Sequence, residues 1–229
     1  PTERGLLAMV SYYDHRKRIV PRPTILLDKN TDDAHDNPVI ALDKDGHIWV
    51  FVSAHGMSRP AYIVRSKRPY DVDEFELILE TNFSYPQPWY SSGSGFFFFH
   101  TSYNPGRFLY FQTSRDGIEW SSRTLLAAID EGHYQVSCEK EGNLATAFNY
   151  HPAAFRGDSS RKGLNWRTNL YYLETRDFGA TWQGADGTTV SLPVTQVQHP
   201  ALVRDYESEG KLVYLCDLNF DRSGAPVVL

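Results

Sequence analysis

Short runs of apolar residues, many of them alternating with polar ones, follow one another along the chain of 229 residues. No stretch keeps the 3.6-residue period of an amphipathic helix, and turn-forming residues separate the runs. The pattern therefore predicts an all-β protein. Strands are expected at residues 5–13, 24–28, 47–54, 62–66, 95–103, 107–114, 144–150, 168–175 and 211–218.

Four of the turns share a glycine that precedes a strong predicted strand: Gly46, Gly95, Gly142 and Gly210. The first two intervals are just under fifty residues, and the last is longer because a polar segment, 151–167, intrudes. A period near fifty with about four strands per unit is typical of a β-propeller built from four-stranded blades.

The repeat predicts one β-propeller domain over residues 1–229. We expect whole blades at 31–80, 81–130 and 131–195, the end of a blade at 1–30 and the start of another at 196–229. A chain that covers about four blades and starts and stops within a blade is best interpreted as part of a larger propeller.

Composition limits the classes of partner that we expect the protein to bind. The chain is 41% hydrophobic and 22% charged, with a formal charge of −5 and no stripe of Lys and Arg, so we expect neither nucleic acid nor a membrane as partner. Aromatic residues make up 14% of the chain, which suits strands and surfaces that stack on sugars. Cys138 and Cys216 lie in strand-like runs and are predicted to be two buried free thiols.

Polar side chains stand where the innermost strand of each blade would line a central channel. Aligning the segments before the glycine turns puts His35, Tyr85, His133 and Val197 in one column. Two residues on, and therefore on the same side of the strand, stand Asn37, Gln87, Gln135 and His199. A purely structural strand would offer Val, Ile or Leu here, so the columns predict a ligand-binding rim.

The ends of the second strands add further candidates to this rim: His55, Tyr103 and either His151 or Tyr150. Tyr134 and Asn149 lie beside these positions, Arg107 follows Tyr103 across a tight turn, and Arg167 enters the next strand. These residue types suit removal of a proton next to a carboxylate, which needs a base, an acid and a group that neutralises the carboxylate. A glycosidase needs a pair of carboxylates. Asp32, Asp33 and Asp36 flank His35, but the inward columns hold no separate second acid.

Two predicted turns share a sequence motif. "TRDFGATW" (175–182) matches the Asp-box, or BNR, repeat of sialidase-like propellers, and "SRDGIEW" (114–120) matches it with one residue missing. In such a turn, between the third and fourth strands of a blade, Asp accepts backbone N–H bonds, Gly adopts a special dihedral and Trp packs between blades. The phrase is therefore predicted to be structural.

Several further segments, among them "DDAHDNPVIALDKDGHIWVFVSAHG", "GHYQVS" and "AFNYHP", resemble the BNR-repeat propellers that include ulvan lyases, over residues 30–205. The resemblance implies about seven blades, a secreted or periplasmic location and cleavage of an acidic, uronate-containing polysaccharide by β-elimination. It also implies a His pair, a Tyr and an Arg, which map onto His35, His55 and Arg107. For the tyrosine, Tyr103 and Tyr90 rank slightly above Tyr85.

Further substrate contacts are predicted at the remaining rim residues: Asn37, Tyr85, Gln87, His133, Tyr134, Asn149, His151 and Arg167. Some members of the family hold a structural zinc, for which His199 with Cys216 or His133 with Cys138 are the candidates, although neither pair has a recognised ligand spacing.

Three functions remain open: a polysaccharide lyase, a sialidase-like glycoside hydrolase and a non-catalytic glycan-binding propeller. The hydrolase would need an arginine triad and a Tyr–Glu pair. Arg107 and Arg167 are available for it, but no partner Glu is evident.

Overall fold

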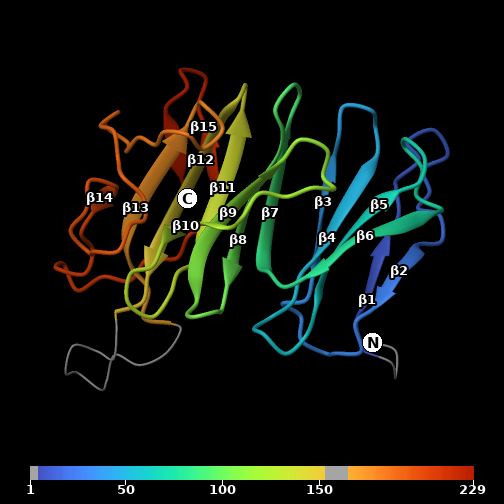
Figure 1. The fold of residues 1–229 in the computed structure, drawn as a ribbon, viewed down its shortest axis with the longest axis horizontal. Coiled ribbons are helices and arrows are strands. Elements are labelled where there is room, and N and C mark those ends of the chain that lie inside the picture. Colours follow the sequence, from blue (N-terminus) through green and yellow to red (C-terminus); the bar gives the residue numbers. More distant parts are fainter. Residues whose placement is uncertain (1–4, 153–164) are drawn as a thin grey trace. The chain divides into compact units, whose positions relative to one another are not determined.

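A computed structural model describes residues 5–152 and 165–229, and every regular element in these residues is a β-strand (Figure 1). This confirms the all-β prediction. Most of the polar segment predicted at 151–167 lies outside the described residues. The strands are β1 (Leu7–Val10), β2 (Thr24–Asp28), β3 (Pro38–Leu42), β4 (Ile48–Val52), β5 (Ala61–Ser66), β6 (Phe75–Thr81), β7 (Ser84–Ser91), β8 (Gly95–Ser102), β9 (Phe108–Ser114), β10 (Thr124–Ala127), β11 (Gln135–Lys140), β12 (Asn143–Tyr150), β13 (Thr168–Thr175), β14 (Leu202–Arg204), β15 (Leu218–Phe220) and β16 (Pro226–Val228).

The strands form three four-stranded antiparallel sheets, in which strands that are consecutive in the chain are neighbours. The orders are β3-β4-β5-β6, β7-β8-β9-β10 and β11-β12-β13-β14, and two further pairs are β1-β2 and β15-β16. The four-stranded repeating unit expected from the glycine turns is therefore present three times. The last strand of the third sheet, β14, pairs with β13 through Leu170–Arg204 and Tyr171–Leu202.

Three of the four glycine turns connect the first and second strands of a sheet, as predicted. Gly46, Gly95 and Gly142 have φ of +84°, +97° and +85°. The positive φ of Gly142 is explained by a two-residue turn. Lys140 pairs with Asn143, and both residues between them have positive φ.

The fourth glycine does not precede a strand, so the strand predicted at 211–218 is wrong over residues 211–217. Backbone groups there bond to scattered partners instead of to one ladder. Val213 N donates to Arg167 O, and Cys216 N donates to Leu229 O. Cys138 is buried and Cys216 is exposed, so only the first matches the prediction of two buried thiols, although both are free.

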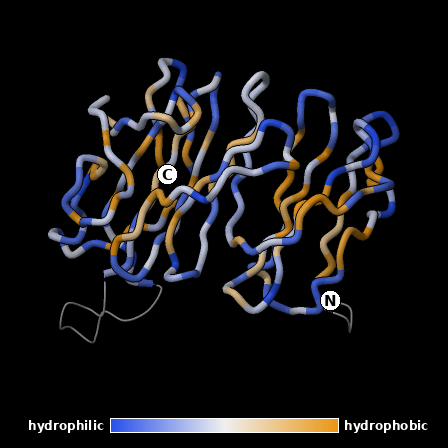
Figure 2. The backbone as a smooth tube through the Cα atoms, viewed as in Figure 1, coloured by the Kyte–Doolittle hydropathy of each residue, from blue (hydrophilic) through white to orange (hydrophobic). Residues whose placement is uncertain are grey.

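The chain divides into two compact units, Pro1–Phe96 with Ser114–Trp120, and Phe97–Thr113 with Ser121–Leu229. In the first unit β4 is buried at all five positions, and Trp49 and Phe51 have no exposed surface. In the second unit Phe148 of β12 stacks on Tyr171 of β13 at 5.2 Å between ring centroids. Figure 2 shows apolar residues gathered along the strands and hydrophilic ones in the connections.

The two repeated turns lie after the third strand of their sheets, and each tryptophan packs on a neighbouring sheet of its own unit. Trp120 lies 6.0 Å from Phe51 of β4 between ring centroids. Trp182 lies 5.3 Å from Phe111 of β9. Within the turns Asp116 accepts hydrogen bonds from the N–H groups of Ile118 and Glu119, and Asp177 from that of Thr181. These contacts are structural, as the sequence predicts.

Candidate active site

The first unit brings His35 and His55 together. His35 lies in the turn before β3, and His55 follows β4 by three residues. Because Pro38 pairs with Val52, the antiparallel register continues to place residue 35 opposite residue 55. The two imidazole rings stack with centroids 4.1 Å apart and planes 22° apart. Tyr85, at the start of β7, presents its ring at a steep angle to both, at 6.0 and 6.2 Å.

Asp33 holds the histidine pair in place. Its Oδ1 lies 2.6 Å from Nδ1 of His35, and its Oδ2 lies 2.9 Å from Nδ1 of His55. Hydrogen bonds from the side chain and the backbone N–H of His35 hold the pKa of Asp33 well below its usual range, so the group is a carboxylate. An ionised carboxylate accepts only, so each Nδ1 carries the proton and Nε2 carries the lone pair of each ring.

A second layer of charges supports Asp33. Arg59 donates Nε and an Nη to the two carboxylate oxygens of Asp36 at 2.9 Å each, and an Nη to Asp33 at 3.0 Å. Asp36 also accepts the backbone N–H of His55 at 2.8 Å and lies 3.4 Å from Lys29 Nζ. Burial raises the pKa of Asp36, but Arg59, His55 and Lys29 more than offset this, so its pKa is lowered.

Sequence reasoning did not include Asp33, Asp36, Arg59 and Lys29 among the site residues. The available signal was the acidic run "DDAHD" around His35, which the absence of a second inward acid led us to discount as catalytic. A cation 23 residues from its carboxylate partner left no trace in the local pattern.

The remaining candidates of the first unit lie along β3 and β7. Asn37 is exposed, and its carbonyl accepts the N–H of Ser53. Gln87 lies two residues beyond Tyr85 on the same side of β7. Tyr90 is placed differently from its predicted role, because five residues of strand separate it from Tyr85 by about 16 Å. Its ring packs on Phe96 at 4.8 Å, so the structure does not bring it to the histidine pair.

The second unit holds a stack of arginine and tyrosine side chains. The guanidinium groups of Arg107 and Arg167 lie 4.1 and 4.0 Å from the ring centroid of Tyr134. Arg167 also lies 4.5 Å from the ring of Tyr214. Tyr103, which directly follows β8, opens the loop that ends at Arg107. Such cation–π stacking fixes the orientation of the two guanidinium groups, those of Arg107 and Arg167.

His151 packs edge-on against this stack, 5.6 Å from the ring of Tyr134. Burial, reinforced by the charges of Arg107 and Arg167, lowers the pKa of His151 to about 4. The ring is therefore neutral near pH 7, and its Nε2 is buried without a hydrogen-bond partner among the described residues.

His133 and Asn149, predicted as substrate contacts, are engaged by the protein itself. Nε2 of His133 accepts the N–H of Ile129 at 2.9 Å, and Nδ1 lies 2.8 Å from Asn149 O. Asn149 accepts the N–H of Tyr134 and donates to Val213 O. Both side chains are fully buried, and burial lowers the pKa of His133 to about 3. They hold the ends of β11 and β12 together, and we do not include them in the proposed site.

Of the two predicted zinc pairs, His133 with Cys138 does not fit the structure, because both ring nitrogens of His133 are used by the backbone. In the other pair, Nδ1 of His199 accepts the N–H of Ala201 at 3.2 Å, and Cys216 is exposed. Among the described residues, Asp33, His35 and His55 have potential ligand atoms within 4.8 Å of one another. Asp33 accepts both Nδ1–H groups, so the carboxylate and the two Nδ1 atoms are already engaged with one another.

The described part of the chain has no helix long and apolar enough to cross a membrane. Repeated four-stranded antiparallel sheets, each with a glycine turn between its first two strands and with polar side chains at strand ends, define a class of all-β repeat protein. The chain belongs to the BNR repeat-containing family, whose model matches residues 8–229.

Ulvan lyases are similar to this chain in both sequence and fold. An ulvan lyase of Alteromonas sp. (strain LOR) is 24% identical over 192 residues, which covers 72% of this chain and 39% of the relative. The structure of an ulvan lyase from a polysaccharide lyase family, bound to -[GlcA(1-4)Rha3S]-, superposes with a TM-score of 0.80 at 16% identity, and a second ulvan lyase structure with 0.78 at 17%. Each superposition covers 95% of this chain and 57% of the other, so the chain spans well under two thirds of its relatives.

Proposed function

We propose that this chain carries the active site of a polysaccharide lyase that cleaves a uronic-acid-containing, ulvan-like glycan by β-elimination, on a β-propeller of which it forms about four blades. The observation that carries the proposal is the stacked His35–His55 pair, bonded through both Nδ1 atoms to Asp33. The similarity to ulvan lyases supports the same chemistry.

The proposed reaction begins with proton abstraction. Nε2 of His35, whose side chain is half exposed, takes the proton from C5 of the uronate. The electron pair of the C5–H bond forms the C4–C5 double bond, and the bond from C4 to the glycosidic oxygen breaks. The Tyr85 hydroxyl protonates that departing oxygen, which yields an unsaturated uronyl end and a free hydroxyl.

The uronate carboxylate needs a hydrogen-bonding or cationic partner, because its negative charge opposes loss of the neighbouring proton. His55 is the group of the first unit that we assign to it, because it lies beside His35 and shares Asp33. Arg107 remains the predicted arginine. Asn37 and Gln87 remain predicted sugar contacts of the first unit, and Tyr134, His151 and Arg167 of the second. Tyr103, predicted as a catalytic tyrosine, remains the alternative to Tyr85.

The test is direct. The chain is incubated with ulvan and with other polyuronates, and the ultraviolet absorbance of the unsaturated uronyl product is followed. We expect an increase that His35→Ala and His55→Ala each reduce by about 100-fold or more. His15→Ala, which changes an exposed histidine on another loop of the same unit, is the matched control and should retain activity.

Two results would contradict the proposal. Absence of an absorbance increase on every polyuronate, together with glycan binding that His35→Ala weakens, would favour a non-catalytic glycan-binding propeller. Cleavage of a fluorogenic sialoside without any unsaturated product would favour the hydrolase.

A further inference from the structure

A basic pocket lies at the turn end of the third sheet, within the second unit. It has a volume of about 480 Å³ and is formed by the β11–β12 turn, the residue after β13 and the β15–β16 hairpin. We propose that this pocket is a second binding site, which takes a segment of an anionic oligosaccharide through its carboxylate or sulfate groups. The choice of a glycan over other anions rests on the proposed function; the pocket's preference for an anion does not.

Positive charge dominates the pocket. Lys140, Arg176 and Arg222 line it, against one carboxylate, that of the exposed Glu141. Within the described residues, the side chain of Arg222 forms no ion pair or hydrogen bond, whereas that of Arg176 lies 3.2 Å from Glu174. The carboxylate of Asp221, next to Arg222, is already engaged by Ser223 and the N–H of Ala225. An incoming anion therefore meets cations whose charge is only partly neutralised.

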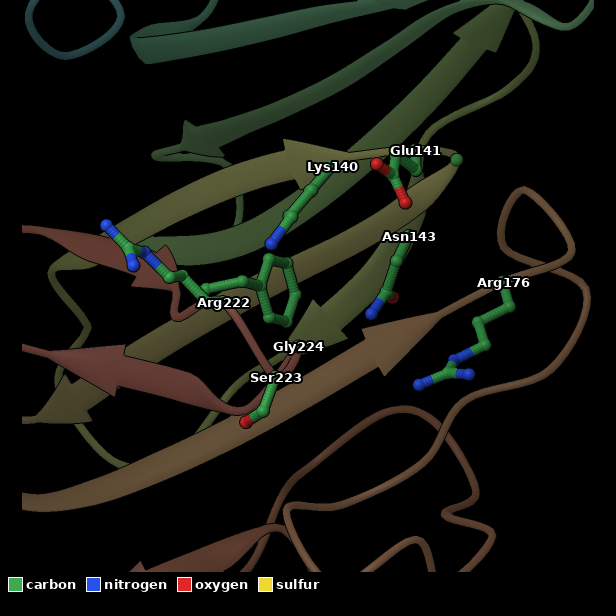
Figure 3. A pocket seen from close by; sticks show the side chains of 9 residues that line it. Lys140, Glu141, Asn143, Arg176, Arg222, Ser223 and Gly224 are labelled. Carbon is green, nitrogen blue, oxygen red and sulfur yellow. The ribbon is translucent and has the colours of Figure 1, made fainter.

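The cations are spread along the pocket. In Figure 3, Arg222, Lys140, Asn143 and Arg176 follow one another across it, with Arg222 and Arg176 at opposite sides of the view. A linear ligand with repeated negative groups matches this spacing better than one small ion does. Repeated acidic groups on a chain are the chemistry of an acidic polysaccharide.

The pocket also offers the contacts that a sugar needs. The ring of Phe220 lines it, and aromatic rings pack on the apolar faces of sugars. Asn143 adds an amide to the lining, and its Nδ2 donates to Glu174 at 3.3 Å.

Its position separates the pocket from the candidate site residues of the second unit. Tyr134 and His151 lie at one end of β11 and β12, whereas Lys140 and Asn143 lie at the other end of the same strands. Six to eight residues of strand place the two ends about 20–25 Å apart. The pocket is also held as a preformed unit, because Lys140 Nζ donates to Asp221 O at 2.8 Å and joins the two hairpins.

The experiment measures oligosaccharide binding by isothermal titration calorimetry. It uses the His35→Ala variant of the chain, which is not expected to cleave the ligand. The ligands are a sulfated glucuronate oligosaccharide, its desulfated and carboxyl-reduced neutral form, and inorganic sulfate. We expect Arg176→Gln with Arg222→Gln to weaken binding of the charged oligosaccharide about tenfold at low salt, and the neutral form to bind weakly to either protein. Arg16→Gln with Lys17→Gln removes the same charge from an exposed loop of the first unit and should have no effect.

The outcomes separate this site from the proposed function. Equal affinity of the double variant and the control variant overturns the second site, whether or not the unmodified chain cleaves ulvan. Inorganic sulfate that binds as tightly as the oligosaccharide also overturns it, because the pocket would then be a small-anion site. Loss of binding in the double variant of a chain that cleaves no polyuronate supports the pocket and contradicts the lyase. A nuclear magnetic resonance spectrum of the double variant confirms that it is folded.

Discussion

At the scale of single residues, the candidate chemistry depends on one carboxylate. Asp33 accepts a hydrogen bond from each histidine of the pair and from Arg59, so it sets both the tautomer and the orientation of the two rings. A histidine whose Nδ1–H is held by a carboxylate presents Nε2 as a base, and its protonated form is stabilised. Asp33 is therefore a positioning residue that acts through His35 and His55.

Asp33→Asn should lower kcat/KM for β-elimination about 100-fold. The physical reason is that an amide cannot accept both Nδ1–H groups as the carboxylate does, so the rings lose the tautomer and the orientation that present Nε2. The measurement is kcat/KM on ulvan. Asp32→Asn, one residue away and exposed, is the matched control and should retain kcat/KM. An unchanged kcat/KM in Asp33→Asn would contradict the positioning role.

At the scale of elements, the turn that follows β9 is part of the core of the first unit. Gly117 has φ of +76°, and a Cβ there would lie 2.4 Å from the ring of Trp49. The ring of Trp120 from the same turn packs on Phe51 and Phe96. The turn therefore fixes how one sheet packs on the strands beside it, and its glycine is required both for its dihedral and for its lack of a side chain.

Gly117→Ala should lower the free energy of unfolding by about 2–5 kcal/mol, because positive φ and the clash with a buried ring add together. Gly142→Ala is the matched control. Gly142 also has positive φ, but a Cβ there meets nothing within 4 Å, so about 1–2 kcal/mol is expected. Urea unfolding of the two variants measures the difference. Equal losses would show that the turn does not pack against Trp49 in solution.

At the scale of the whole molecule, three buried histidines make the protein sensitive to acid. Burial lowers the pKa of His100 and His133 to about 3 and that of His151 to about 4. In the unfolded chain the pKa of each is about 6.5. The three imidazole side chains are therefore neutral in the folded protein over a pH range in which the same side chains of the unfolded chain bind protons.

The free energy of unfolding should be constant with respect to these groups above about pH 7 and fall as the pH drops from about 6.5 towards 4. The slope should reach about 1.4 kcal/mol per pH unit for each histidine, because the unfolded state takes up one proton more per group. Urea unfolding at a series of pH values measures it. A flat dependence between pH 7 and 5 would contradict the buried, neutral state of these rings.

The sequence predicted the fold more completely than it predicted the candidate site. Three glycine turns and the "TRDFGATW" and "SRDGIEW" phrases lie where the repeat puts them, because turn residues act over a few neighbouring positions. The strand expected at 211–218 did not form over most of its length, since a strand needs a continuous partner and its apolar alternation does not supply one.

The sequence by itself determined the all-β class, the four-stranded unit and the residue types available for proton transfer. Local pattern is enough for these, because strand periodicity and turn chemistry are short-range properties. Only the tertiary structure decided which polar residues meet. The pairing of β3 with β4 placed His35 against His55, and the fold brought Arg59 to Asp33 and Asp36. Burial separated His133, which holds the backbone, from the exposed His35, because hydrogen-bond partners distant in the chain are set by packing and leave no periodic signal.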